Sequence, residues 1–304
     1  MVSFLYRNHG DGGHVAFLGI DIGSATTRAA LIDEDLHMLA LANSPTHIDG
    51  TFQTTVDDVH IAARKALDQA GFRFGAIDAL CVSVSGVVDN ETGRAFSPVL
   101  DWIDPMPVRT IVNKYISVPV FVANDAAAAA VGEAHYGTGM PYDRFALIRL
   151  GTLIETAVVM GGKPIENDEL PTQACTEGEF LLEAHELIEE DGEHELDLSG
   201  IGLGRIRSSQ VMEEARRQNP VAIRAANWLA ERMTESLVES ATLYAPQAAI
   251  IAGATQRDQL HLGKLVTRRL AETRSAIAGI PVESASLGND AKAFGSAIIA
   301  LQRA

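Results

Sequence analysis

Cysteine, basic residues and long apolar runs are scarce in this chain of 304 residues. The two cysteines are too few for a disulfide framework or for a zinc site built from several cysteines. Lys and Arg number 24 against 40 Asp and Glu, and the net charge of -16 repels a phosphate backbone, which predicts no direct binding to nucleic acid. No apolar run reaches the roughly 20 residues of a membrane helix, and no signal segment opens the sequence. We therefore expect a soluble, cytoplasmic protein without a membrane partner.

Apolar residues are nevertheless abundant. They make up 47% of the chain, which is enough to bury a sizeable core. The length suits one large domain or two of ordinary size, and we expect two. Residues 1–14 are polar and glycine-rich, which predicts a flexible tail that is too short for a helix-turn-helix motif.

Short apolar runs alternate with helical spacings, which predicts a mixed α/β fold in two halves with related openings. In the first half we expect strands over 14–23, 26–33 and 37–45, a helix over 55–71, a strand over 76–86, and a short helix and a strand before 124. In the second half we expect strands over 144–151 and 154–162, helices over 177–190 and 220–246, a strand over 248–253, a helix over 258–276, a strand over 280–286 and a closing helix over 289–304.

Glycine turns follow several of these strands. At Asp21-Ile22-Gly23-Ser24 a sharp corner exposes backbone N–H groups, and glycine lets an anion approach closely, so the turn can hold a phosphate. Asp21 would suit a magnesium ion held through water. Similar turns occur at Leu150-Gly151-Thr152 and Ala252-Gly253-Ala254. The alternative is structural: Gly23 serves a hairpin, and Asp21 caps a turn.

An Asn-Asp pair stands where a predicted strand becomes a helix that opens with five alanines. The carboxylate of Asp125 can accept a proton from a sugar hydroxyl that attacks a phosphoryl group, and Asn124 offers a donor and an acceptor to neighbouring hydroxyls. Because the first turn carries no bulky side chain, a ligand can approach the helix end. The alternative is that Asp125 is the N-cap of the helix and has no chemical role.

Five segments together resemble the ROK family of sugar kinases and kinase-derived repressors. They are "LGIDIGSATTRAALID", "VSVSGVVDNETG", "PVFVANDAAAAAVGEAHYGTG", "LIRLGTLIETAVVMGGKPI" and "LGNDAKAFGSAIIAL". The resemblance implies two ribonuclease-H-like domains of the actin-like ATPase type around a central cleft. It divides the chain into an N-terminal domain over 15–123 plus 289–304 and a C-terminal domain over 124–288. It also implies a homodimer.

The same resemblance implies roles for individual residues. Asp125 is the general base, and the sugar-binding residues are Asn124, Gly86 and Glu179. ATP is bound with Mg²⁺, which Asp21 contacts through water. The residues that surround the nucleotide are Asp21, Gly23, Ser24, Thr26, Gly151, Thr152 and Gly253.

The chain departs from the family pattern in four places. The Glu-Ile-Gly-His segment that usually holds sugar hydroxyls is missing, and Gly178-Glu179 is a poor remnant of it, with the alternative that Glu179 is a solvated acid of a helix. The first phosphate loop reads Gly23-Ser24-Ala25-Thr26, so the lysine of the usual Gly-Gly-Thr-Lys is absent. The second loop carries side chains in place of glycines, and Glu155 places a negative charge where a phosphate would lie. The zinc motif of one histidine and three cysteines has no counterpart, since Cys175 stands alone near His185 and His194, and we predict no zinc.

Two functions are compatible with these observations. The first is an ATP-dependent kinase that phosphorylates a hydroxyl of a hexose or amino sugar, which the retained Asn124-Asp125 pair favours. The second is a sugar-sensing or regulatory protein with weak or no catalysis, which the altered phosphate loops favour.

Overall fold

The computed structural model describes residues 15–48, 52–165, 175–191, 207–253 and 255–304. The tail predicted for residues 1–14 lies outside them. The chain forms two compact units. The first contains β1 to β8, α1 to α3, β11 and α8; the second contains β9, β10, β12 to β14 and α4 to α7.

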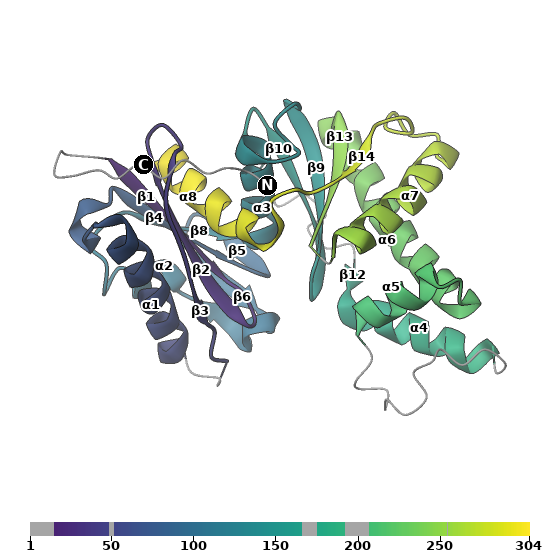
Figure 1. Cartoon of the computed structure of the whole chain (residues 1–304), viewed down its shortest axis with the longest axis horizontal. Helices are drawn as coiled ribbons and strands as arrows, with labels where there is room; N and C mark the ends of the chain where they lie inside the picture. Colours follow the sequence, from purple (N-terminus) through teal and green to yellow (C-terminus); the bar gives the residue numbers. More distant parts are fainter. Residues whose placement is uncertain (1–14, 49–51, 166–174, 192–206, 254) are drawn as a thin grey trace. The chain divides into compact units, whose positions relative to one another are not determined.

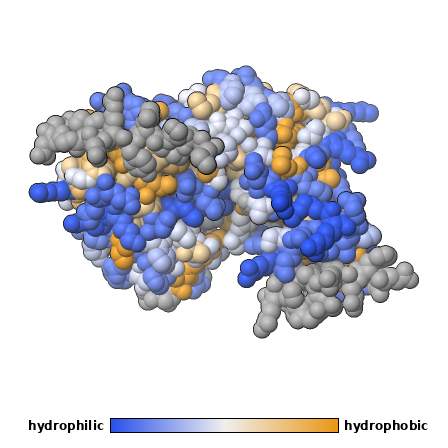
Figure 2. All heavy atoms as spheres, viewed as in Figure 1, coloured by the Kyte–Doolittle hydropathy of each residue, from blue (hydrophilic) through white to orange (hydrophobic). Residues whose placement is uncertain are grey.

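Hydrophilic residues cover much of the face seen in Figure 2. In the part of the chain that the structure describes, every helix is too short or too polar to span a bilayer.

The first unit is built on a sheet of order β3-β2-β1-β4-β8 (Figure 1). β1 (Ala16–Ile22), β2 (Thr26–Asp33) and β3 (Met38–Pro45) form an antiparallel meander, and β4 (Ala79–Val84) and β8 (Val120–Asn124) continue the sheet in parallel with β1. All residues of β1 are buried, because helices pack against both faces of the sheet.

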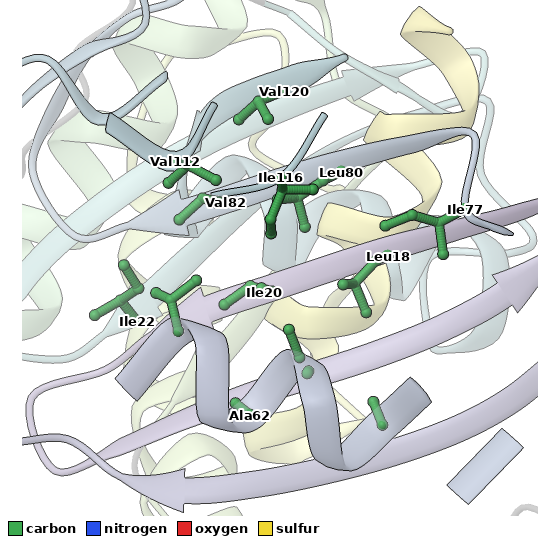
Figure 3. Close-up of a cluster of buried hydrophobic side chains, with 14 of the residues drawn as sticks. Leu18, Ile20, Ile22, Ala62, Ile77, Leu80, Val82, Val112, Ile116 and Val120 are labelled. Carbon is green, nitrogen blue, oxygen red and sulfur yellow. The ribbon is translucent and has the colours of Figure 1, made fainter. Parts of the chain in front are cut away.

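Alternation along β1 assigns its side chains to two different helices. Leu18, Ile20 and Ile22 join the core that includes Ala62 of α1 (Phe52–Ala70), as Figure 3 shows. The intervening positions face α8 (Ala291–Arg303), since a β-carbon added at Gly19 would lie 2.1 Å from the backbone nitrogen of Ala297. Asp21 shares that face, and so points toward the last helix.

Helices α3 (Asp125–Tyr136) and α8 cross at two glycines. A β-carbon added at Gly295 would lie 1.7 Å from the carbonyl oxygen of Ala128, and one added at Gly132 would lie 2.3 Å from that of Ala291. The small residues of both helices therefore allow their backbones to meet. As a result α3 belongs to the first unit, whereas the sequence-based division placed residues 124–136 in the second domain.

A small antiparallel sheet of β5 (Val87–Asp89), β6 (Arg94–Ser97) and β7 (Trp102–Met106) follows β4. We did not expect these strands from the sequence. Pro105 and Pro107 keep the β7 segment extended, and the predicted short helix is α2 (Val108–Val112). The unit also contains a two-residue strand, β11 (Lys163–Pro164), and 3-10 turns at Phe74–Ala76 and Pro98–Leu100. A third 3-10 turn, at Gly288–Asp290, leads into α8.

In the second unit, β9 (Arg144–Leu150) pairs antiparallel with β10 (Leu153–Met160) and parallel with β13 (Ala248–Gly253). β14 (Val282–Ser284) lies beside β13, and β12 (Cys175–Thr176) pairs with β10. The helices are α4 (Glu177–Asp191), α5 (Ser208–Arg216), α6 (Pro220–Tyr244) and α7 (Gln256–Glu272). Of these elements, β12 and α5 were not expected from the sequence.

Candidate active site

Three parallel strands of the first unit end at the same edge of the sheet. The strand register aligns Ile22 with Val84 and Val84 with Asn124. The turn at Gly23, the turn at Gly86 and the start of α3 therefore lie side by side, although they are far apart in the sequence. Ligands of open α/β sheets bind beyond the carboxyl ends of the strands, so this edge is the candidate site.

Asn124, not Asp125, caps helix α3. Its side-chain oxygen accepts hydrogen bonds from the backbone N–H groups of Ala126 (2.8 Å) and Ala127 (3.1 Å). Its amide nitrogen donates to the carbonyl oxygen of Gly86 at 2.8 Å. The N-cap is therefore Asn124, which corrects the alternative that placed Asp125 at that position, and the chemical role of Asp125 stays a prediction. Asn124 thereby ties the end of β8 to the turn after β4, and its predicted contact with sugar stays a prediction.

Asp125 is the first residue of α3, and its side chain is only 2% exposed. The N-terminus of a helix stabilises a negative charge. The ammonium of Lys292, in the first turn of α8, lies 3.6 Å from a carboxylate oxygen of Asp125. Both features favour the ionised form of a carboxylate, which is the form that can accept a proton, and the role of Asp125 as general base stays a prediction.

Asp21 belongs to the same cluster of charges. Its carboxylate lies 2.9 Å from the ammonium of Lys292 and 4.0 Å from the guanidinium of Arg28, its partner across β1 and β2. Arg28 also approaches Asp290 at 3.5 Å. Burial raises the pKa of Asp290, and the neighbouring guanidinium of Arg28 partly offsets this increase. Five charged residues of the first unit thus converge at the sheet edge.

The first glycine loop is the turn of the β1–β2 hairpin, which is the structural role that the sequence left open for Gly23. The backbone N–H of Gly23 donates to the carbonyl oxygen of Thr26 at 3.2 Å, and Ser24 is exposed. Thr26 occupies the position where the family carries lysine, and it is the first residue of strand β2. Gly86 must be glycine: its φ is +122°, and a β-carbon there would lie 2.2 Å from the carbonyl oxygen of Phe96. The predicted contacts of this loop with a nucleotide stay predictions.

The second unit brings its two glycine turns together. β9 and β13 are parallel with Leu150 opposite Gly253, so Gly253 ends β13 beside the point where Gly151 follows β9. A β-carbon at Gly253 would lie 1.9 Å from the carbonyl oxygen of Leu150, and its φ is +76°. Only glycine permits this approach.

The charge of Glu155, which the sequence placed where a phosphate would lie, is paired with a cation in the structure. Glu155 is 3% exposed and lies opposite Arg149 in the β9–β10 ladder, with 3.1 Å between the guanidinium and the carboxylate. A β-carbon at Gly151 would lie 2.3 Å from that guanidinium. The group next to the Gly151 turn is therefore a cation, which is compatible with a phosphate.

A pocket of about 510 Å³ opens beside this turn, wholly within the second unit. The starts of α5 and α7 reach it, and helix N-termini favour anions. Its lining residues are Leu150, Gly151, Thr152, Ile154, Glu177, Phe180, Arg207, Ser208, Ser209, Met212, Leu229, Thr255, Asp258 and Leu262. The sequence indicated Gly151 and Thr152 but not the α5 residues, because α5 itself was not expected.

Glu179 serves the start of α4. Its carboxylate accepts a hydrogen bond from the backbone N–H of Thr176 at 2.6 Å, and its own N–H donates to the Thr176 hydroxyl at 3.0 Å. The residue is exposed. This reciprocal cap is a sufficient structural reason for Glu179, so its sugar contact stays a prediction.

Asp21 offers the oxygen donor that magnesium prefers, but two cations already engage it. A metal held by Asp21 would lie against the ammonium of Lys292, and the residues present do not fit that arrangement. Among the described residues, no group of three or more His, Cys, Asp or Glu is placed to hold a metal ion. His194, considered for zinc, lies outside the described residues, and the absence of zinc stays a prediction.

Sequence reasoning missed Lys292, Arg28 and Asp290. One signal was available for Lys292: a lysine in the first turn of a helix opposes the helix dipole and needs carboxylates nearby.

The fold and the site define a class, the α/β proteins of the actin-like ATPase type. The chain belongs to the ROK family, whose family model matches residues 17–168 and 196–303. It is similar to glucokinase of Streptomyces coelicolor, with 27% identity over 319 residues that cover 93% of this chain and 96% of that protein.

A solved structure and a repressor extend the comparison. The ROK family glucokinase from Streptomyces griseus, in complex with glucose and AMPPNP, is 25% identical with a TM-score of 0.73, over 95% of this chain and 100% of that one. A xylose repressor from Caldicellulosiruptor bescii is 24% identical over 222 residues, or 65% of this chain and 55% of the repressor. Sugar kinases and repressors, the two kinds of protein that the resemblance to the family named, are thus both among the relatives.

Proposed function

We propose that this protein is an ATP-dependent sugar kinase that transfers the terminal phosphoryl group of ATP to a hydroxyl of a hexose or amino sugar. The observation that carries the proposal is that the two adjacent residues at the end of β8 make different contacts. Asn124 caps α3, and the buried carboxylate of Asp125 lies beside Lys292, where we propose that it accepts the hydroxyl proton. The similarity to a glucokinase that binds glucose and AMPPNP supports it and makes glucose the first acceptor to test.

In the proposed reaction the sugar hydroxyl oxygen attacks the terminal phosphorus of ATP. The new oxygen–phosphorus bond forms as the bond to the bridging oxygen breaks, ADP leaves with the electron pair, and the proton passes to the carboxylate of Asp125. The pocket of the second unit, with its glycine turn and two helix starts, is the proposed nucleotide pocket. The Asn124–Gly86 hydrogen bond keeps the neighbouring turn in place.

The test is Asp125→Asn, which keeps the shape and removes the base. Wild-type protein should form ADP only when a hexose or amino sugar is present, and the variant should lose about 100- to 10,000-fold in kcat. Asp58→Asn is a matched control, because Asp58 is also a buried acid of the first unit but bonds to His47 instead. Its turnover should equal that of wild type. No sugar-dependent ADP formation, or full activity in Asp125→Asn, would refute the proposal.

Sugar sensing without transfer is the second candidate. The first phosphate loop carries no basic side chain, and repressors occur among the relatives. This function predicts that a sugar raises the Tm while AMPPNP does not, because only a ligand that binds the folded state stabilises it. The kinase predicts that both ligands raise the Tm.

A further inference from the structure

Lys292 is an unusual residue for the place that it occupies. It is the second residue of α8, where a positive charge opposes the helix dipole, and its side chain is only 14% exposed. A buried ammonium is unfavourable unless it is paired. Its partners are the two carboxylates of the site, Asp21 at 2.9 Å and Asp125 at 3.6 Å.

The ammonium also lies beside the first glycine loop. A β-carbon added at Gly23 would lie 3.9 Å from the Lys292 nitrogen. The loop itself, Gly23-Ser24-Ala25-Thr26, has no basic side chain. A cation beside this loop is therefore delivered by a different element, α8, and the same ammonium contacts the candidate base.

We infer that Lys292 binds the phosphoryl group during transfer and supplies the positive charge that the first phosphate loop lacks. The inference rests on the proposed kinase function. As the bond to ADP breaks, negative charge remains on the non-bridging phosphoryl oxygens, and a fixed ammonium beside them stabilises the transition state. Lys292 stays protonated throughout, since the hydroxyl proton goes to Asp125. This assignment also explains why Asp21 is not placed as a metal ligand: its carboxylate orients the lysine.

Two variants test the inference through nucleotide binding. Lys292→Met should weaken the binding of AMPPNP at least tenfold in calorimetry but change the binding of ADP by less than threefold, because ADP lacks the terminal phosphate. Its kcat should fall at least 100-fold. Lys292→Arg keeps the charge and should retain most of the preference for AMPPNP. Lys65→Met is the matched control, since it removes one exposed lysine from the same unit, and it should behave as wild type.

A labelling experiment on the wild-type protein covers the case in which Lys292→Met does not fold. AMPPNP should slow the acetylation of Lys292 several-fold relative to ADP, as measured by mass spectrometry. Lys65, Lys114, Lys163 and Lys264 are the other lysines of the chain and serve as internal standards.

Equal effects of AMPPNP and ADP on Lys292, in binding and in labelling, would overturn the inference even if the wild type is an active kinase. A lower Tm of Lys292→Met with unchanged preference for AMPPNP would show a purely structural lysine and overturn it as well. Absence of sugar-dependent turnover in the wild type is a separate result that refutes the proposed function.

Discussion

At the scale of residues, the adjacent Asn124 and Asp125 have different contacts: Asn124 caps α3, and Asp125 lies beside Lys292. Both residue types can cap a helix, so the sequence alone could not say which one does. The structure identifies the capping residue: the oxygen that accepts the helix N–H bonds belongs to Asn124, and Asp125 is the first residue of the helix. The Asn124 amide also donates a hydrogen bond to the Gly86 carbonyl. A single side chain therefore fixes both the start of α3 and the Gly86 turn next to Asp125.

Replacing Asn124 with alanine should therefore affect stability and activity together. Loss of the cap should lower the free energy of unfolding by about 1–2 kcal/mol, measured by urea denaturation. Turnover should fall as well, because the Gly86 turn loses its anchor. Asn219→Ala is the matched control, since Asn219 caps α6 with the same pair of bonds, at 3.0 Å and 3.1 Å. It should lose similar stability with normal turnover. Equal turnover in both variants would contradict this role of Asn124.

At the scale of elements, the crossing of α3 and α8 depends on glycine. Gly295→Ala would push a methyl group into the Ala128 carbonyl, and we expect it to destabilise the protein by ~1–3 kcal/mol or more. Gly263→Ala in α7 is the opposite case, since its nearest neighbours are side-chain atoms at 3.8 Å and 3.9 Å. It should stabilise by up to about 1 kcal/mol through helix propensity. The Tm of both variants measures the contrast, and a neutral Gly295→Ala would argue against the tight crossing.

The elements that sequence reasoning predicted are those with strong periodic signals. The buried strands before each glycine turn were placed because apolar runs end sharply there, and the ROK membership and the actin-like ATPase fold are confirmed. The small sheet β5–β7 was missed because its strands are short and partly exposed, as at Val87. Lys292 was missed because its partner Asp21 lies on β1, far away in the sequence, and its place in the first turn of a helix was the single local signal.

At the scale of the whole molecule, each unit contains one buried cysteine, Cys81 in β4 and Cys175 in β12. Burial raises the pKa of both thiols to about 12. Both should react slowly with a thiol reagent in the folded protein and rapidly in urea. A bound sugar should slow the labelling of Cys81, and AMPPNP should slow that of Cys175, whose neighbours Ile154 and Glu177 line the pocket. Rapid labelling without denaturant would contradict the burial.

The same thiols give a pH dependence with a definite sign. Their folded pKa lies above the ordinary value of 9.0, so their contribution to stability is complete below about pH 9 and decreases as pH rises from there toward 12. Urea midpoints at pH 8 and pH 10 should show the decrease, and Cys81→Ala should reduce it. The predicted homodimer and the absence of nucleic-acid binding remain predictions for solution experiments.

The position of α8 has a consequence for how the protein is made. The sheet of the first unit is synthesised early, but the helix that covers Gly19 on its α8 face is, of all the elements described, the one that leaves the ribosome last. Until then the second unit is complete while the first lacks both its cover and its ammonium. A chain interrupted before α8 would thus carry the proposed nucleotide pocket without the lysine that we infer to bind the phosphoryl group.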